Sequence, residues 1–320
     1  MSIISTDLSK AIAILNKDAL VAIPTETVYG LAGNIFSEKA IKSIFETKQR
    51  PFFNPLIVHI PSVDVLPDIV SYIPEKAQLL ADAFWPGPLT LVLKKNSGIP
   101  DIITAGKDTV AVRIPNHPVA LELLQRLDFP LAAPSANPFG SISPTTAQHV
   151  NDYFKDKIEM VLDGGPCQRG IESTIIGFEN DEPIIYRLGS TSVEAIENIV
   201  GPISVKNRKQ IAPDAPGMLD RHYAPKTETI LVDDISEAIK KHKDKRIGIL
   251  AINSPSEDDG IAFQIVLSEA TDLQEAASKL YDALHQLDKH DLDIIIAERF
   301  PDFGLGKSIN DRLQRATVRA

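Results

Sequence analysis

The chain has 320 residues, of which 43% are hydrophobic and 24% charged, and this composition excludes a wholly disordered or fibrous protein. At about 150 residues per domain, the length predicts two domains. The net charge of −10 argues against a broad nucleic-acid-binding or anionic-membrane surface, and a single cysteine excludes an intramolecular disulfide and a multi-cysteine metal site.

The N-terminal segment carries aspartate and lysine within an amphipathic pattern and lacks the basic start and apolar run of a signal peptide. No run of about 18 consecutive apolar residues occurs, so no transmembrane helix is predicted. The single cysteine, Cys167, suits a reducing compartment, and we interpret it as incidental because it has no obvious histidine partner. We therefore expect a cytoplasmic protein that binds no membrane.

Strand-length apolar runs alternate with helical periods through the first part of the chain, and this alternation is typical of an α/β fold. Pro74 stands at the first turn of one predicted helix, where its missing N–H removes no helical hydrogen bond. In chain order the pattern predicts a helix at 7–18, a strand at 19–24, a helix at 37–47, a strand at 56–60, a helix at 74–84, strands at 89–93 and 109–114, a helix at 117–127, a strand at 130–134, a helix at 145–154, strands at 159–163, 173–178 and 183–188, and a helix at 192–199.

The apolar rhythm stops between residues 201 and 227, where prolines interrupt a stretch without a clear period. We interpret this stretch as a linker over 204–227 that joins a first domain at 1–203 to a second at 228–320. The second domain resumes the α/β alternation, with strands at 229–234, 246–252, 263–267 and 293–297 and helices near 235–243, 271–289 and 306–316.

Polar residues crowd the end of the first predicted strand, in PTETVYGLAGN at 24–34. Thr25, Glu26 and Thr27 follow the strand directly, and open α/β sheets bind ligands at their strand ends. The alternative is a simple turn whose glycines supply unusual backbone angles. The residues alone leave both interpretations open.

The segment KQRPFFNPLIVHI at 48–60 places two cations, Lys48 and Arg50, at the end of a predicted helix. The helix dipole alone accounts for their charge. It does not explain why a proline-flanked turn with Asn54 leads into an apolar strand that carries His59. A strand histidine is either a core residue or a ligand contact, and both remain open.

DTVAVRIP at 108–115 alternates with a period of two, which places Thr109, Ala111 and Arg113 on one face of the predicted strand. Arg113 then points at an enclosed surface. A guanidinium there needs an anionic partner, because burying it unpaired is costly. A structural Asp or Glu meets this need, and so does a ligand carboxylate or phosphate.

PSANPFGSISPTT at 134–146 places Ser135 and Ser143 ahead of a predicted helix. Hydroxyls, backbone N–H groups and a helix N-terminus suit an anion such as phosphate, although Ser143 also suits a helix cap. Ser173 and Arg187 stand at the start and the end of two later strands. The Walker loop, HExxH and GxSxG are absent, and no acidic cluster has metal-ligand spacing.

Six segments in one order closely resemble the YrdC-like family: PTETVYGL, KxRPxxNPLxxHI, WPGPLT, DTVAVRIP, APSAN and ESTII. The later PGMxxRHYAP segment and the second domain resemble the two-domain form of the threonylcarbamoyl-AMP synthases. The resemblance implies a twisted open mixed sheet with flanking helices, together with a second, smaller Rossmann-like α/β domain.

The activity that the resemblance implies is that of a nucleotidyltransferase. It joins L-threonine, bicarbonate or CO2, and ATP into threonylcarbamoyl-adenylate and releases pyrophosphate. The product feeds a downstream transferase complex that makes threonylcarbamoyladenosine in tRNA. Magnesium is expected to arrive on the ATP phosphates, with no prosthetic group and no stable nucleic-acid binding.

The resemblance also assigns roles to individual residues. In the basic motif, Lys48 and Arg50 are the implied catalytic cations. The implied L-threonine contacts are Thr27, His59, Arg113, the backbone of Ala133, and Ser173. The implied ATP contacts are Arg50, Asn54, Thr109, Ser135, Ser143, Arg187 and Tyr223.

Two further hypotheses concern the linker and the second domain. His222 and Tyr223 are expected to close over the nucleotide and exclude water. The second domain is expected to anchor the linker rather than to carry a second catalytic site. An RNA-binding module without turnover is the alternative function, and the acidic charge argues against it. Carbamoyl transfer is disfavoured because acylphosphatase and zinc-finger segments are absent.

Overall fold

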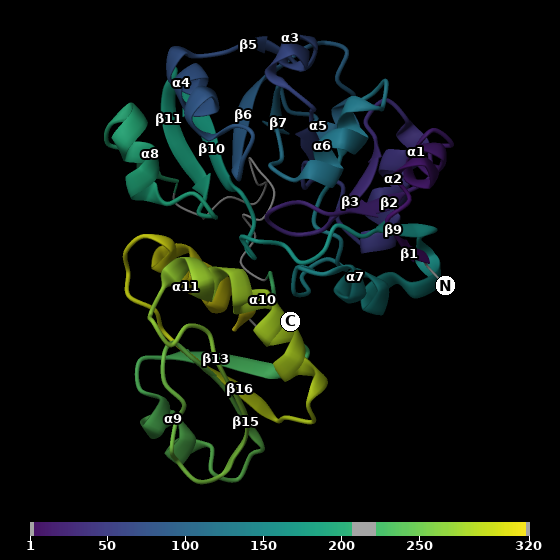
Figure 1. Ribbon diagram of the computed structural model, residues 1–320. Helices are drawn as coiled ribbons and strands as arrows, with labels where there is room; N and C mark the ends of the chain where they lie inside the picture. The colour runs from purple at the N-terminus through teal and green to yellow at the C-terminus, as the bar shows by residue number, and fades with distance from the viewer. Residues whose placement is uncertain (1–2, 207–221, 318–320) are drawn as a thin grey trace.

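The computed structural model describes residues 3–206 and 222–317. It has the predicted α/β architecture, with a large twisted mixed sheet flanked by helices in the first part of the chain and a four-stranded sheet in the second (Figure 1). Every helix and strand predicted from the apolar pattern is present, with its ends shifted by a few residues. The element types could therefore be predicted from periodicity alone.

The first part of the chain adds short elements that the pattern does not predict, among them β1, β3, β5 and α5. Its elements in chain order are β1 (Ile3–Ser5), α1 (Leu8–Leu15), β2 (Val21–Ile23), β3 (Gly30–Asn34), α2 (Glu38–Lys48), β4 (Ile57–His59), η1 (Val63–Val65), α3 (Leu66–Ile69), β5 (Val70–Tyr72), α4 (Glu75–Phe84), β6 (Leu89–Lys95), α5 (Asp101–Thr104), β7 (Thr109–Arg113), α6 (Pro118–Gln125), β8 (Leu131–Ala132), α7 (Ala147–Phe154), η2 (Lys155–Lys157), β9 (Met160–Leu162), β10 (Thr174–Glu179), β11 (Glu182–Arg187), α8 (Val193–Val200) and β12 (Ser204–Val205).

These strands form one sheet in the order β1-β9-β2-β3-β8-β4-β7-β6-β10-β11-β12, and β5 pairs with β6. The sheet is mixed, because β4 and β7 are parallel whereas β6 and β7 are antiparallel. The register of β4 on β7 places His59 beside Arg113. Two residues that stand far apart in the sequence are thereby neighbours at one strand end.

Strand β3 occupies the glycine-containing end of the 24–34 motif. Neither Gly30 nor Gly33 has a positive φ, so the turn interpretation is wrong for this part of the motif. A Cβ atom on Gly30 would lie 3.1 Å from the Cβ of Ala133. Glycine is needed here because two backbones approach closely, and not because the chain adopts a left-handed conformation.

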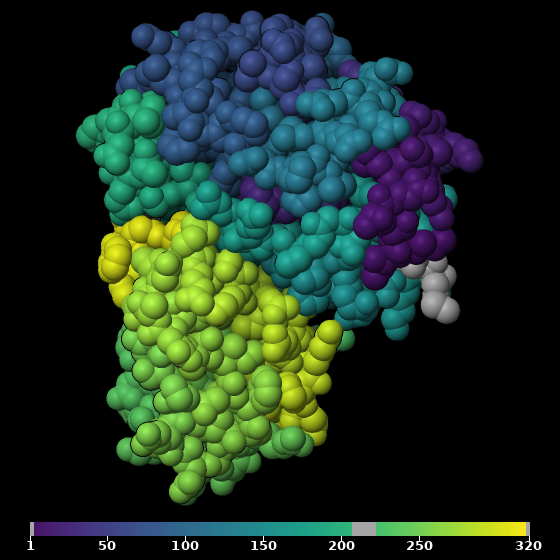
Figure 2. All heavy atoms as spheres, in the orientation of Figure 1, coloured from purple at the N-terminus to yellow at the C-terminus, as the bar shows by residue number. Residues whose placement is uncertain are grey.

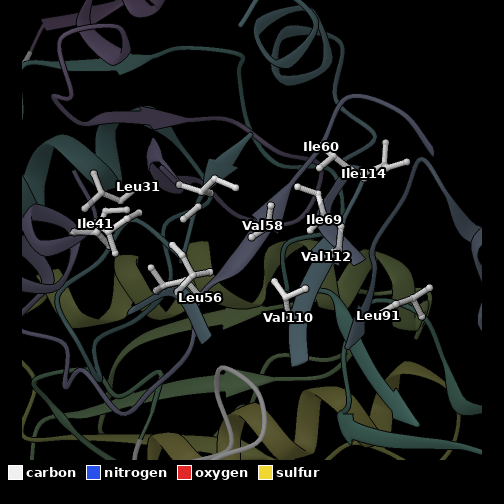
Figure 3. Close-up of a cluster of buried hydrophobic side chains, with 14 of the residues drawn as sticks. Leu31, Ile41, Leu56, Val58, Ile60, Ile69, Leu91, Val110, Val112 and Ile114 are labelled. Atoms are coloured by element: carbon white, nitrogen blue, oxygen red, sulfur yellow. The ribbon is translucent and has the colours of Figure 1, made fainter. Parts of the chain in front are cut away.

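Buried clusters cover both faces of the sheet: one packs against helices such as α2, and the other packs against α1 and α6. Val110 and Val112 from β7, the following residue Ile114, and Val58 from β4 belong to the cluster on the α2 side (Figure 3). Ala111 belongs to a separate small cluster. The predicted two-residue alternation in β7 is confirmed, and it directs Arg113 away from the main core.

The second part of the chain contains β13 (Glu228–Val232), α9 (Ile235–Lys241), β14 (Ile247–Ala251), β15 (Ile261–Val266), α10 (Leu273–Lys289), β16 (Ile294–Glu298) and α11 (Leu305–Ala316). Its strands are all parallel in the order β13-β16-β14-β15. A Rossmann-like character for this domain remains a prediction.

The two parts pack directly against each other (Figure 2). Helices α10 and α11 lie on the side of the small sheet that faces the first part (Figure 1). The predicted linker is described only at its ends: β12 pairs with β11, and Ala224 donates to the carbonyl of Gly140. Residues 207–221 lie outside the described part of the chain. None of the helices in the described ranges has the length and apolar character needed to span a membrane.

Candidate active site

One cavity brings together side chains from segments far apart in the sequence. All five predicted threonine contacts line it, and so do Arg50, Ser135 and Arg187 from the predicted nucleotide set. The lining residues are Thr25, Thr27, Val28, Gly30, Arg50, Ile57, His59, Arg113, Ala133, Pro134, Ser135, Glu172, Ser173, Arg187 and His222.

Arg113 is almost fully buried and held on three sides. Its Nη2 lies 2.7 Å from Oε1 of Glu26, Nη1 donates to Oγ1 of Thr27 at 2.9 Å, and Nε donates to the carbonyl of Gly87 at 3.2 Å. The anionic partner that the sequence left open is therefore Glu26, from the 24–34 motif. The guanidinium is fixed in orientation, which suits recognition of a carboxylate.

His59 lies beside Arg113 and is 3% exposed. Burial, helped by the positive charge of Arg113, lowers the pKa of His59 to about 3, so the ring is neutral near pH 7. Its Nδ1 lies 3.2 Å from the carbonyl of Ile57, which only accepts, so Nδ1 carries the proton. The other ring nitrogen, Nε2, is left as an acceptor for an amine or a hydroxyl.

Ser173 connects the two predicted binding sets. Its hydroxyl is 2.8 Å from Oγ1 of Thr90 and accepts a hydrogen bond of 3.1 Å from Nη2 of Arg187. The same guanidinium donates to the Ser173 carbonyl at 2.8 Å. Arg187, at the end of β11, is thereby held against the start of β10.

Arg50 is a buried cation whose protein partners are neutral. It donates to the carbonyls of Asn54 at 3.2 Å and Pro55 at 2.8 Å. Burial and the nearby charge of Arg187 lower the pKa of Arg50 to about 9, which leaves it charged near pH 7. Two buried guanidiniums favour an anion such as phosphate in this part of the cavity.

Lys48 does not line the cavity, in contrast to the catalytic contact that the resemblance implies. Its ammonium donates to the backbone carbonyls of Ser135 and Asn137. Burial, together with Arg50, lowers the pKa of Lys48 well below its usual range. The structure therefore assigns Lys48 to holding the loop that carries Ser135, because a buried ammonium needs acceptors and these carbonyls supply them.

Two of the predicted nucleotide contacts, Thr109 and Asn54, are not among the residues that line the cavity. Thr109 shares the face of Arg113 but lies at the opposite end of β7, where it lines a separate groove with Lys94 and Phe178. Asn54 is fully buried, and its amide has no hydrogen-bond partner among residues 3–206 and 222–317. The structure does not bring Thr109 to the cavity, whereas Asn54 lies beside Arg50.

Ser143 and Tyr223 lie behind the lining. The predicted capping role falls to Thr146, which caps α7, and the hydroxyl of Ser143 instead donates to Oε1 of Glu172 at 2.6 Å. Tyr223 is fully buried and adopts a left-handed backbone with a φ of 64°. From the linker end, His222 rather than Tyr223 is the residue that lines the cavity.

Sequence reasoning missed the two site carboxylates. Glu26 was noted in its motif without a role, although it is the ion-pair partner of Arg113. Glu172 directly precedes Ser173 in the ESTII segment, so the motif contained a signal for it. Two of the residues that hold Glu172, Tyr281 and Arg312, come from the second part of the chain, where the sequence offers no motif that points to Glu172.

The protein offers no cage for a metal ion in the part that the structure describes: no three His, Cys, Asp or Glu side chains are grouped to hold one. Glu172, the acidic residue among the described residues that line the cavity, is already engaged by protein donors. The residues present therefore do not fit a protein-bound metal centre.

Comparisons with known proteins cover both parts of the chain. A family model for Sua5, YciO and YrdC, described as "Telomere recombination", matches residues 13–189. A second, described as "Threonylcarbamoyl-AMP synthase, C-terminal domain", matches residues 191–318. The threonylcarbamoyl-AMP synthase of Pyrococcus abyssi is 42% identical, covering 96% of this chain and 93% of that protein. That of Bacillus subtilis is 40% identical, covering 97% and 92%.

Solved structures give the same relationship. The crystal structure of P. abyssi Sua5 complexed with L-threonine superposes with a TM-score of 0.92 at 40% identity, covering 99% of this chain and 97% of that chain. Escherichia coli YciO shares the fold of the first part, with a TM-score of 0.55 at 22% identity. The resemblance predicted from the six motifs is thus confirmed: the chain belongs to the Sua5/YciO/YrdC family, in the form that carries the C-terminal domain of the threonylcarbamoyl-AMP synthases.

Proposed function

We propose that this chain is a threonylcarbamoyl-AMP synthase, a nucleotidyltransferase that joins L-threonine, bicarbonate or CO2, and ATP and releases pyrophosphate. One observation carries the proposal: Arg113, His59 and Ser173 line the same cavity as Arg50 and Arg187. An amino acid and a nucleoside triphosphate bound to these two groups would lie side by side. The relative crystallised with L-threonine supports the amino-acid half.

At the threonine end, Arg113 and His59 divide the recognition. The oriented guanidinium of Arg113 takes the carboxylate, and Nε2 of His59 accepts from the amine or the side-chain hydroxyl. Ser173 and the backbone of Ala133 hold the remaining polar atoms. These neutral and cationic groups together match a free amino acid.

At the nucleotide end, Arg50 and Arg187 face the phosphates, and Ser135 contributes from the loop that Lys48 holds. Each such contact is expected to contribute roughly 2–4 kcal/mol when water is excluded. Asn54 and Ser143 complete the set from just behind the lining. The nucleotide contacts of Thr109 and Tyr223 remain predictions.

The chemistry requires no covalent enzyme intermediate. The neutral amine of threonine adds to the carbon of CO2 and loses a proton, which gives a carbamate. A carbamate oxygen then attacks the α-phosphorus of ATP, a new P–O bond forms, and the bond to the β-phosphate bridging oxygen breaks with loss of pyrophosphate. Catalysis is then positioning together with charge stabilisation by the guanidiniums.

Magnesium belongs to the substrate in this proposal, carried on the ATP phosphates, because the described residues form no metal cage. The mixed anhydride product is an activated acyl donor, so a transferase that modifies adenosine in tRNA is the expected consumer.

Pyrophosphate release tests the proposed function. The protein is given ATP and Mg²⁺ with L-threonine and bicarbonate, and each of these two substrates is omitted in turn from carbonate-depleted buffer. Release should need both. Release that persists without threonine contradicts the proposal, and RNA binding with a steep salt dependence but no turnover supports the RNA-binding alternative instead.

A further inference from the structure

Glu172 is the one acidic side chain among the cavity-lining residues that the structure describes. It lies directly before Ser173, and its side chain is 7% exposed. Arg187 is close enough to affect its ionisation. A carboxylate in this position opposes the binding of a triphosphate unless another group neutralises it, because charges interact strongly where water is excluded.

Groups from the second domain engage the Glu172 carboxylate directly. Nε of Arg312 in α11 donates to Oε2 of Glu172 at 2.8 Å, and the hydroxyl of Tyr281 in α10 donates to the same oxygen at 2.9 Å. Oε1 accepts from Ser143 at 2.6 Å. Both carboxylate oxygens are thus occupied, and two of the three donors lie in helices that follow the linker.

Arg312 is itself fully enclosed, with a side-chain exposure of 0%. Nη2 donates to the carbonyl of Leu188 at 2.7 Å, and Nη1 pairs with Asp311 at 2.6 Å. Leu188 directly follows Arg187. One guanidinium therefore holds Glu172, which lines the cavity, and Leu188, which directly follows the cavity-lining Arg187.

Arg312 also contacts the end of the linker. Its guanidinium carbon lies 4.8 Å from the centre of the Tyr223 ring, and Tyr223 stacks on Tyr281 with ring centres 5.6 Å apart. These contacts keep the left-handed backbone at Tyr223 in place. His222, the residue directly before Tyr223, lines the cavity.

Glu172 is ionised under working conditions. Burial alone would raise its pKa, but the opposing charges of Arg312 and Arg187 outweigh burial and lower the pKa of Glu172 to about 2. Loss of Arg312 would therefore leave a negative charge at the nucleotide end without the cation that pairs with it directly.

We propose that Arg312 is a positioning residue of the nucleotide site: it neutralises Glu172 and, through Leu188, holds the end of β11 that carries Arg187, so that ATP binding depends on the docked second domain. The inference rests on the proposed function for the identity of the anion. It differs from a purely stabilising contact between domains because it affects ATP and leaves threonine binding unchanged.

Binding, and not turnover, is measured, so the outcome is independent of whether the chain makes the proposed product. ATP with Mg²⁺ and L-threonine are titrated separately by calorimetry into the full-length parent and its variants. Arg312→Met removes the cation, and Glu172→Gln/Arg312→Met removes both charges. Lys307→Met is the matched control, because Lys307 in α11 also bridges to the first domain, at Glu194, but at a partly exposed position away from the cavity-lining residues.

The Kd for ATP should rise at least about tenfold in Arg312→Met and return to within about threefold of the parent in the double variant, with the Kd for threonine changed by less than about twofold. Lys307→Met should match the parent. Parent-like ATP binding in a folded Arg312→Met, a double variant as weak as the single, or equal loss for threonine overturns the inference.

Tyr281→Phe provides a second test of the inference if Arg312→Met does not fold. It removes one donor to Glu172 and keeps the ring that stacks on Tyr223. ATP binding about threefold weaker, with unchanged threonine binding, supports the inference. Unchanged ATP binding in Tyr281→Phe rejects it.

Discussion

Arg113 enters the cavity with its orientation already set. Glu26, Thr27 and the carbonyl of Gly87 each engage one of its nitrogens. Because Glu26 already balances the charge, a substrate carboxylate is recognised chiefly through hydrogen-bond geometry. At the scale of single residues, threonine selection therefore belongs to the Arg113 and Glu26 pair and not to Arg113 alone.

Arg113→Ala should raise the KM for threonine about a hundredfold, which corresponds to roughly 3 kcal/mol for a charge-assisted pair, and leave the KM for ATP within about threefold. Steady-state pyrophosphate release with each substrate varied in turn measures both constants. Arg126→Ala, an exposed arginine in the helix that follows, is the control. Equal increases in the KM values for threonine and ATP would contradict the assignment of Arg113 to the threonine carboxylate.

A Lys48→Met variant tests whether Lys48 binds phosphate directly or holds the loop that carries Ser135. Lys48→Met leaves the carbonyls of Ser135 and Asn137 without their buried donor. The free energy of unfolding, measured in urea, should therefore fall by about 1–3 kcal/mol. A direct phosphate ligand would instead give full stability with a KM for ATP raised more than about tenfold. Urea unfolding and the KM for ATP, measured on the same preparation, distinguish the two roles.

At the scale of elements, periodicity predicts the long helices and strands, but it does not predict β3 or the placement of Lys48. Strand β3 contains two glycines, and from sequence alone a glycine is equally compatible with a turn and with a close approach of two backbones. The motif order identifies Arg113, His59 and Ser173 correctly as residues of one cavity. Their partners could not be predicted, because contacts such as Arg312 with Glu172 depend on how two domains dock.

The linker end that carries Tyr223 is packed, not exposed, and this gives a testable consequence. Tyr223→Ala removes the ring between Arg312 and Tyr281, so the KM for ATP should rise about tenfold while the first domain stays folded. Tyr223→Phe should behave like the parent, because the hydroxyl has no hydrogen-bond partner among the described residues. An unchanged KM for ATP in Tyr223→Ala would show that this segment only connects the two domains.

At the scale of the whole molecule, buried histidines make the fold sensitive to acid. His285 lies between the two parts of the chain, 3.2 Å from the Ser143 carbonyl and stacked on His149. Burial, together with the charge of His149, lowers the pKa of His285 to about 3. Below the unfolded pKa of about 6.5, the unfolded chain binds protons that the folded chain does not, so stability falls as the pH decreases toward 3.

Between pH 7.5 and pH 5, His285 should account for roughly 2 kcal/mol of lost stability, at about 1.4 kcal/mol per pH unit below 6.5. His285→Gln retains a donor for the Ser143 carbonyl and should lose correspondingly less stability over this range. Glu172, with a pKa near 2, does not titrate in this window. Urea unfolding at the two pH values measures the difference, and an identical loss in parent and variant contradicts the assignment.

A crystal structure with L-threonine and a non-hydrolysable ATP analogue is the most direct measurement of the central claim. We expect the threonine carboxylate on Arg113, the triphosphate on Arg50 and Arg187, and the amine facing the α-phosphorus within one cavity. Threonine and nucleotide on separate surfaces, or phosphates placed away from both guanidiniums, would contradict it.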